Sequence, residues 1–281
     1  MSVIETAGST AASTTASTRG AARRKGAALN RLPLGWIVPV AFLVIWHGAY
    51  EAGWINPTLL SSPIQVAQTL WESMRDGAFW ENLGMSVRRW IFGFLIGGFL
   101  GLVLGALTGL SRFSERMLDS TFQMLRTVPL MGLVPLFIVW FGIGEQPKII
   151  LIAYGAFFNI YLSTFAGIRD IDRKLIEVGR VYELSPLQMV RRIVLPAAMP
   201  QVLHGIRLSL GVAWLALVIA ELNGASSGIG FWMQQGREFV RVDIVIAALV
   251  VFAVVGKLVD VLVRALERRL LSWRDNLAKE M

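Results

Sequence analysis

The chain has 281 residues, of which 55% are hydrophobic and 16% charged, and its mean hydropathy is +0.59. Apolar runs of about twenty residues recur along it, each long enough to cross roughly 30 Å of hydrocarbon, so the composition predicts a membrane protein with several spans and excludes an ordinary soluble domain. There is no cysteine, which excludes disulfides, thiolate metal sites and cysteine nucleophiles, and the two histidines are too few for a metal cluster.

The net charge of +8 comes largely from arginines between the apolar runs. Positive charge in that position is the usual signal that keeps a loop in the cytoplasm, so we predict no nucleic-acid partner. The carboxylates are scattered along the chain, and we expect no catalytic residue, no metal site and no cofactor. The sequence lacks a G-x-x-x-x-G-K-[ST] phosphate loop, so the chain cannot energise transport by that route.

The chain order predicts a tail, a membrane domain and a second tail. Residues 1–32 are polar and basic and are expected to be disordered, residues 33–268 form the membrane domain, and residues 269–281 form a cytoplasmic C-terminal tail. The sequence thus predicts an all-α integral membrane protein with six transmembrane helices and both termini in the cytoplasm, because arginines and lysines crowd the even-numbered loops and both tails. The six segments lie at approximately 34–50, 90–110, 118–141, 148–168, 203–222 and 244–263.

The first outer loop is the exception to this charge rule. Arg75, Arg88 and Arg89 fall in it, although positive charge is expected on the inner side. Because the segment 51–89 also carries acidic residues, we predict that it lies as an amphipathic helix on the outer surface of the membrane.

The second apolar segment has a glycine at every fourth position. Because four residues turn a helix about 40° beyond a full turn, the stripe is expected to wind around the helix, and the missing side chains let a neighbour approach closely. Two interpretations stay open, static packing and a sliding surface. The stripe comprises Gly93, Gly97, Gly101, Gly105 and Gly109.

The third apolar segment is interrupted between residues 127 and 135, where it reads T-V-P-L-M-G-L-V-P. Pro129 and Pro135 each remove a backbone donor, and free carbonyls at membrane depth are tolerated only inside protein or facing water. The segment therefore predicts either a broken helix that lines a pathway or a packing kink.

A polar stretch at 172–200 separates the fourth and fifth apolar segments. Its first half predicts a short helix with an apolar stripe and charges at pairing distance. Ser185 and Pro186 are typical of a second helix start, with the serine as cap, and Leu195 and Pro196 are expected to end that helix. We predict a cytoplasmic helix-turn-helix, apolar underneath and charged above. The stripe of the first helix comprises Leu175, Val178 and Tyr182.

This stretch resembles the E-A-A, three residues, G, nine residues, I-x-L-P motif of ATP-binding-cassette (ABC) importer permeases of the methionine-permease-like fold. Glu177 matches the motif glutamate, and Ile193, Leu195 and Pro196 match its end at the same spacing. Glu183 stands where the family has glycine, the residue that takes a left-handed turn at little cost, so the tightness of the bend is not predicted.

Other stretches are similar to the branch of this family that carries aliphatic sulfonates, taurine, nitrate and related small solutes. The likeness to the sulfonate members is carried by Q-M-L-R-T-V-P at 123–129 and V-G-K-L-V-D at 255–260. The resemblance implies an inner-membrane permease that forms a homodimer with a second copy of itself. It also implies contacts with membrane lipid, cytoplasmic ATPase subunits and a periplasmic or lipid-anchored solute-binding protein. The residues that it implies for ATPase coupling are Glu177, Gly179, Arg180, Tyr182, Glu183, Ser185, Ile193, Leu195 and Pro196.

A few polar and helix-breaking residues in the apolar segments are candidates for the pathway or its gate. Glu221 lies at the outer end of the fifth segment, where it either shapes an outer gate or reaches interfacial water. Arg126 and Arg207 either attract a sulfonate or extend to the inner interface. Asn159 occupies a position where relatives often have proline. The pathway or gate candidates are Arg126, Pro129, Pro135, Asn159, Glu221 and Asn223.

Two other classes of protein compete with the permease. A self-sufficient secondary transporter would show duplicated halves or an intramembrane ion site, and the sequence has neither. A membrane enzyme would need clustered His, Asp or Cys, which are absent from this sequence. The permease subunit of an importer for a small organic anion is the preferred interpretation.

Overall fold

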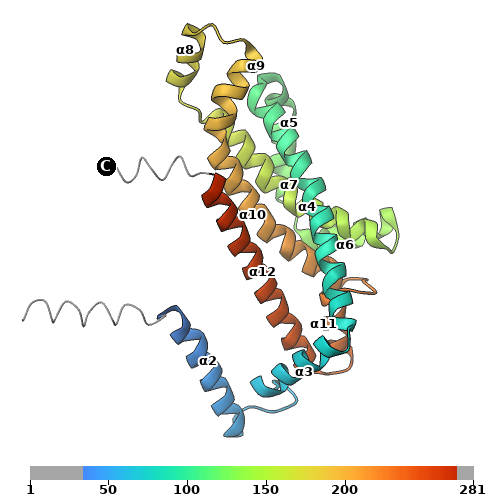
Figure 1. Cartoon of the computed structure of the whole chain (residues 1–281). Helices are drawn as coiled ribbons and strands as arrows, with labels where there is room; N and C mark the ends of the chain where they lie inside the picture. Colours follow the sequence, from blue (N-terminus) through green and yellow to red (C-terminus); the bar gives the residue numbers. More distant parts are fainter. Residues whose placement is uncertain (1–33, 271–281) are drawn as a thin grey trace, which may run out of the picture. The chain divides into compact units, whose positions relative to one another are not determined.

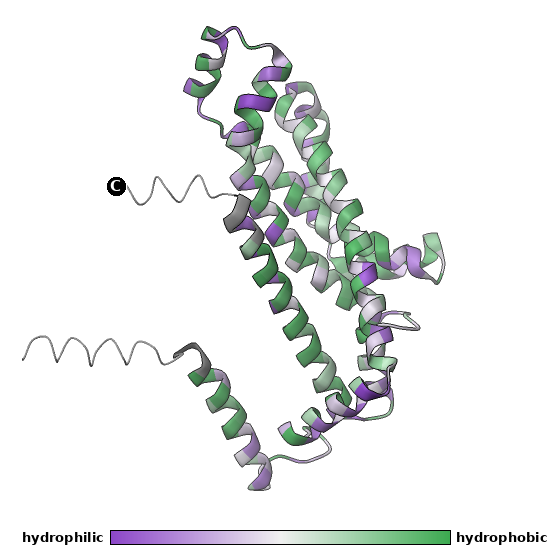
Figure 2. Cartoon of the chain, in the orientation of Figure 1, coloured by the Kyte–Doolittle hydropathy of each residue, from purple (hydrophilic) through white to green (hydrophobic). Residues whose placement is uncertain are grey.

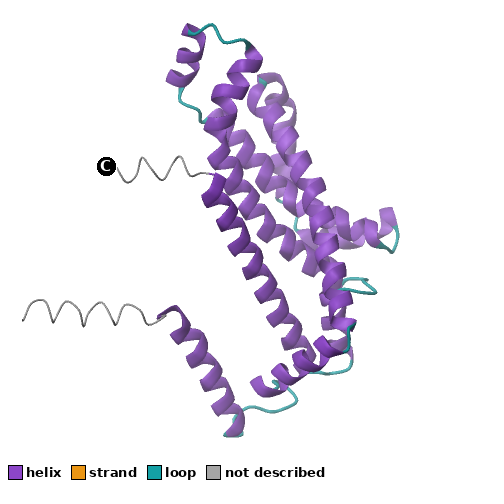
Figure 3. Ribbon diagram, in the orientation of Figure 1, coloured by secondary structure: helices purple, strands orange, loops and turns teal. Residues whose placement is uncertain are grey.

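The structure is a computed structural model that describes residues 34–270, and within that range it contains helices and no strand (Figures 1 and 3). The predicted N-terminal tail 1–32 lies outside the described residues, and so does the predicted C-terminal tail 269–281 except for residues 269 and 270, which belong to the last helix. Contacts divide the chain at Pro63 into two units, which we describe separately. The elements are α2 (Leu34–Glu51), α3 (Pro63–Arg75), α4 (Ala78–Leu110), α5 (Arg112–Arg126), α6 (Leu130–Phe141), α7 (Glu145–Arg169), α8 (Arg173–Val181), α9 (Pro186–Met189), the π-helical turn η1 (Val190–Val194), α10 (Leu195–Leu222), α11 (Ile229–Glu238) and α12 (Val242–Leu270).

The first unit contains α2, which coincides with the first predicted span. Its apolar side chains are largely exposed, among them Val38, Phe42 and Ile45, as expected for a helix surface that faces lipid in a membrane.

The second unit contains the long apolar helices. Four helices of the described chain are long and apolar enough to cross a membrane, and the bent pair α5 and α6 makes five if it counts as one span. Those four are α4, α7, α12 and the continuous helix from Pro186 to Leu222. The predicted count of six is therefore not confirmed by length and composition, because the described apolar part of α2 is shorter than a full span.

The predicted outer amphipathic helix over 51–89 is wrong in its extent. Only α3 lies in that segment as a separate amphipathic helix, and α4 already begins at Ala78, after the left-handed Gly77. Nothing in 78–110 breaks a helix, so α4 spans about 50 Å at 1.5 Å per residue, more than the hydrocarbon thickness. Arg88 and Arg89 therefore belong to the N-terminal part of a core helix.

The glycine stripe of α4 packs directly against α7. A Cβ atom added to Gly97 would lie 2.0 Å from the carbonyl oxygen of Ala153, and one added to Gly105 would lie 2.7 Å from that of Tyr161. The pairs advance together along both helices, so α4 and α7 run parallel and the stripe follows its neighbour for its whole length. Close packing is thus confirmed, and it forms because missing side chains bring the two backbones together.

Helix α10 packs antiparallel to α7 on a different face from α4, and α12 packs against α10. Gly205 of α10 faces Ser163, and Gly155 of α7 faces Ala216. The Nε1 of Trp214 donates to the carbonyl oxygen of Phe252 over 3.1 Å and ties α10 to α12. These contacts build the buried core of the second unit, with α7 at its centre.

The interruption in the third apolar segment is a sharp bend. Helices α5 and α6 meet at 103°, and Pro129 caps the start of α6 while Pro135 lies inside it. Pro129 has no backbone N–H and disfavours a helical conformation in the residue before it, which is why the helix does not continue straight through this point. The predicted break is confirmed. Figure 2 shows α6 as mainly hydrophobic beyond the bend.

Candidate functional site

The first half of the predicted helix-turn-helix is α8. Asp172 caps it, because its Oδ1 accepts a hydrogen bond from the backbone N–H of Lys174 at 2.9 Å. The helix ends in a tight turn in which the N–H of Leu184 donates to the carbonyl of Gly179 at 3.0 Å and that of Glu183 donates to Arg180 at 2.9 Å. This pair of bonds is the Schellman arrangement of a helix C-terminus.

Glu183 adopts the left-handed conformation that the family motif assigns to glycine. Its φ is +52°, a region that costs a residue with a side chain about 1–2 kcal/mol. The tight bend therefore forms without the glycine, because the two capping bonds at Gly179 and Arg180 hold the turn.

The second half begins as predicted and continues further than predicted. The Oγ of Ser185 accepts from the N–H of Gln188, whose Oε1 accepts from the N–H of Ser185 at 3.0 Å, a complete capping box. The expected end at Leu195 and Pro196 is wrong. The chain passes through η1 into α10, since Pro196 lies in the first turn of α10 and the π-helical turn before it changes the bonding register.

The two halves touch at Gly179. A Cβ atom there would lie 2.6 Å from Cδ1 of Ile193 and 2.7 Å from Cε of Met189, so a larger residue would have to displace the ends of these two side chains. The predicted apolar stripe on α8 is not buried, because Val178 is 50% and Tyr182 76% exposed.

The polar residues of the segment are exposed as well. In residues 34–270, Arg173, Glu177 and Arg180 form no ion pair with one another, contrary to the pairing that their spacing predicts. Figure 2 shows hydrophilic residues gathered at this end of the second unit, on α8, α9 and η1.

A buried charge cluster lies away from this segment, where α7 begins and α10 ends beside the N-terminal half of α4 (Figure 1). Arg89, only 1% exposed, donates from Nη1 to Oε1 of Glu221 at 2.7 Å and from Nε to Oε2 of Glu145 at 2.5 Å. Lys148 donates to the same Glu145 at 2.9 Å. Two cations thus balance two carboxylates, which is the condition for burying such charges.

The cluster also holds the loop between α10 and α11. Arg89 donates from Nη1 to the carbonyl oxygen of Ser227 at 2.6 Å. The carboxylate of Glu221 accepts from the Oγ of Ser86 at 2.8 Å and from the N–H of Gly230 at 2.9 Å. A Cβ at Gly228 would lie 2.3 Å from Oε1 of Glu221, so this loop can pass only because it carries glycine there.

The cluster brings one predicted candidate into a network that sequence reasoning missed. Glu221 is 1% exposed, so it does not reach interfacial water in this structure. The sequence analysis predicts neither its partner Arg89 nor Glu145, the other partner of Arg89. An arginine placed against the positive-inside rule, with two acidic residues at the matching ends of other apolar segments, is the signal that could have found them.

The other pathway candidates do not join this cluster. Arg126 and Pro129 are exposed at the bend, Pro135 is exposed on α6, and Asn159 is half-buried, with its carbonyl beside Gly205. Asn223 caps the end of α10 by donating from Nδ2 to the carbonyl of Ile219 at 2.8 Å.

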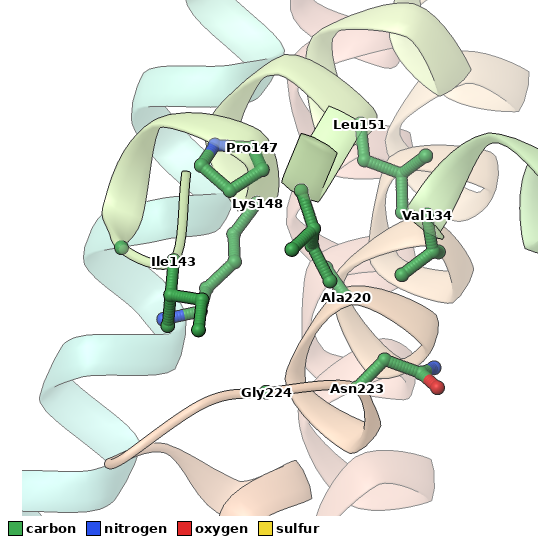
Figure 4. Close-up of a pocket in the computed structure, with 10 residues that line it drawn as sticks. Val134, Ile143, Pro147, Lys148, Leu151, Ala220, Asn223 and Gly224 are labelled. Carbon is green, nitrogen blue, oxygen red and sulfur yellow. The ribbon is translucent and has the colours of Figure 1, made fainter. Parts of the chain in front are cut away.

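A small apolar pocket adjoins the cluster and has Asn223 at its rim (Figure 4). It has a volume of about 140 Å³, and α6, the start of α7 and the end of α10 form its walls. Figure 4 shows Val134, Leu151 and Ala220 around it, with the stem of Lys148 along one side.

Charges at the other end of α10 and α12 pair among themselves. Asp260 lies 3.3 Å from Nη2 of Arg207, 2.7 Å from Nη2 of Arg264 and 3.8 Å from Nζ of Lys257. Lys257 and Asp260, three residues apart on α12, are therefore paired as part of a larger network. In the described part of the chain no group of three or more potential ligands could hold a metal ion.

Residues 97–272 match the family described as binding-protein-dependent transport system inner membrane component. The chain belongs to this family. It is 47% identical to the permease SsuC of Bacillus subtilis strain 168, over 86% of this chain and 88% of that protein, and 44% identical to SsuC of Escherichia coli K12, over 85% and 90%. The chain is therefore the permease subunit of an ABC importer, a non-catalytic inner-membrane component that works with an ATPase and a solute-binding protein.

A solved structure supports the fold. The chain has a TM-score of 0.61 to a chain in the crystal structure of an amino acid ABC transporter with histidines, and the match covers 71% of this chain and 97% of that chain at 18% identity. The helix arrangement described above is thus that of an ABC permease.

Proposed function

We propose that this permease carries aliphatic sulfonates across the inner membrane. The supporting observation is the identity of 47% and 44% to two permeases from distant bacteria that are both named for aliphatic sulfonate transport, each matched over at least 88% of its length. Taurine, nitrate or another small solute is the alternative within the same machinery.

Deleting the gene is expected to abolish growth on butanesulfonate as sole sulfur source and to leave growth on sulfate unchanged. Without the permease a fixed anion cannot cross the hydrocarbon, because burying an unpaired charge there is too costly. Growth yield on each sulfur source measures this, with the gene restored on a plasmid as control. Unimpaired growth on alkanesulfonates together with lost growth on taurine or nitrate would contradict the proposal.

We propose six spans with both termini in the cytoplasm, which makes α2 the first span and the bent pair α5 and α6 the third. Helices α4 and α7 run parallel, and α10 and α12 run antiparallel. These directions support the topology, because successive spans cross the membrane in opposite directions and every second span crosses it in the same direction. It places α8 and α9 on the cytoplasmic side and the buried charge cluster on the outer side.

We propose that the segment 172–200 contacts the ATPase. Its stripe of exposed apolar side chains, with unpaired Glu177 and Arg180 beside it, fits a surface that another protein covers. Glu183 and Ser185 shape the bend, and Gly179 and Ile193 hold the two halves together. A second copy of the permease, expected to be identical, would place two such segments on two ATPase subunits.

Replacing Glu177 with leucine is expected to leave the permease in the membrane and to reduce its co-purification with the ATPase about tenfold or more, because it removes the charge that the motif supplies at the proposed contact. Membrane yield and the amount of ATPase recovered on a tagged permease are the measurements. Glu238→Leu, an exposed glutamate at the end of α11, is the matched control. Normal recovery of the ATPase with the Glu177 variant would contradict the coupling assignment.

We propose that the loop 223–228 and the bent helix α6 form the outer gate of the path. Asn223 and α6 share the walls of one pocket, and Arg89 of α4 holds the loop by donating to the carbonyl oxygen and the Oγ of Ser227. Arg126, Pro129, Pro135 and Asn159 stay pathway candidates, the first three around the bend and the last at mid-depth of α7.

A further inference from the structure

A second pocket lies between the outer parts of α4 and α7. It has a volume of about 290 Å³ and lies on the side of the buried charge cluster. Arg89 lies 21 residues before the C-terminal end of α4, which the proposed topology places on the inner side. At 1.5 Å per residue this is about 31 Å, a distance close to the thickness of the hydrocarbon. The pocket is therefore at the depth of the outer interface. Its lining residues are Met85, Arg88, Arg89, Phe92, Glu145 and Ile149.

Arg88 is the uncompensated charge of this pocket. Arg89 and Lys148 are balanced by Glu145 and Glu221. Arg88 is exposed, forms no ion pair within residues 34–270, and has its guanidinium carbon 5.8 Å from the ring centre of Phe92. The pocket thus carries a net positive charge next to an apolar wall.

The pocket adjoins an apolar groove that runs inward. This groove has a volume of about 420 Å³ between α4, α5 and α7, and it shares Ile149 with the pocket. On α4 the lining positions continue at intervals of three or four residues from the pocket into the groove, so both lie on one face of the helix. Those positions are Met85, Arg88, Phe92, Ile96, Leu100 and Leu104.

We propose that Arg88 binds the sulfonate group of an aliphatic sulfonate at the outer mouth of the path, with the alkyl chain lying along Phe92 and Ile149 toward the apolar groove; this rests on the proposed function. The planar guanidinium donates two parallel hydrogen bonds to oxyanions of this kind. An alkyl chain gains from the apolar wall, whereas nitrate has no chain to bury and the ammonium end of taurine would lose hydration in the groove.

The test uses the permease reconstituted with its ATPase in vesicles, with its binding protein and labelled butanesulfonate at saturating concentration. Arg88→Gln is expected to slow uptake about tenfold, since a charge-assisted pair is lost, and Arg88→Lys to retain about half of it. The matched control is Arg75→Gln on α3. Arg75 is also exposed and also lies over an aromatic ring, 4.9 Å from Trp71, but it lines neither pocket, so uptake should stay within about twofold. Unchanged uptake with Arg88→Gln would overturn the inference.

A second variant tests the alkyl part of the site. Ile149→Phe narrows the junction of pocket and groove and is expected to slow octanesulfonate uptake about fivefold while methanesulfonate uptake changes less than about twofold. Equal losses for both solutes would contradict the proposed path of the chain.

Two further outcomes have distinct meanings. If the wild-type transporter takes up no alkanesulfonate, the proposed function itself fails; if it does and Arg88→Gln is normal, only the site at Arg88 fails. If the defect of Arg88→Gln disappears in vesicles without anionic lipid, Arg88 holds a lipid headgroup in place of the solute, and the inference is overturned.

Discussion

Replacing Arg89 with methionine is expected to lower the free energy of unfolding of the permease by about 3–5 kcal/mol, because it leaves the carboxylate of Glu221 buried without a counter-ion. Glu145 contributes less to this loss, since its side chain is 44% exposed and keeps Lys148 as a partner. The change also removes the bonds that hold Ser227, so the loop between α10 and α11 should loosen.

Unfolding in mixed detergent micelles, followed by the fluorescence of the ten tryptophans, measures this effect. The double variant Arg89→Met with Glu221→Gln is the control, because a neutral amide no longer needs the arginine and can still accept from Ser86 and Gly230. It should recover at least about 2 kcal/mol of the loss, as interacting pairs do in double-mutant cycles. A double variant as unstable as the sum of the two single ones would show that the pair is not coupled.

Replacing Gly97 with alanine is expected to cost about 2–3 kcal/mol, the upper part of the range for overpacking. The new Cβ would lie 2.0 Å from the carbonyl oxygen and 2.7 Å from the carbonyl carbon of Ala153. Both are backbone atoms, so no side chain can rotate away and α4 must separate from α7 along the whole stripe.

The matched control for this prediction is Gly84→Ala in the same helix. A Cβ at Gly84 meets nothing within 4 Å, so this change should be neutral or stabilise by up to about 1 kcal/mol through better helix propensity. Unfolding in the same micelles compares the two variants. Equal stability of both would mean that α4 and α7 are not in close contact in the membrane.

Some features could be predicted from local sequence because local physics determines them. The capping box at Ser185 and Gln188 depends on residues three apart, and the break at Pro129 follows from a missing N–H. The close approach of α4 to another helix follows from glycine at every fourth position. The spacing from Glu177 to Pro196 likewise carried the family resemblance without any knowledge of contacts.

Other features depended on residues that are far apart in the chain. Whether Arg89 lies in water or in the core is decided by Glu145 and Glu221, 56 and 132 residues away, and no local pattern contains that pairing. The extent of α4 differs from the prediction for the same reason, since a charged stretch is typical of an amphipathic surface helix unless distant counter-charges bury it. The end expected at Pro196 failed because η1 rearranges the backbone bonds that a proline would otherwise break.

The sequence by itself determined the class of this protein, a multi-spanning ABC permease, and the place of its polar segment between two apolar helices, because hydropathy and motif spacing act along the chain. Only the tertiary structure decided that Glu221 is paired with Arg89 and that the two halves of the polar segment meet at Gly179. Both outcomes depend on partners brought together by folding, and the ion pair with Arg89 offsets the cost of burying the carboxylate of Glu221.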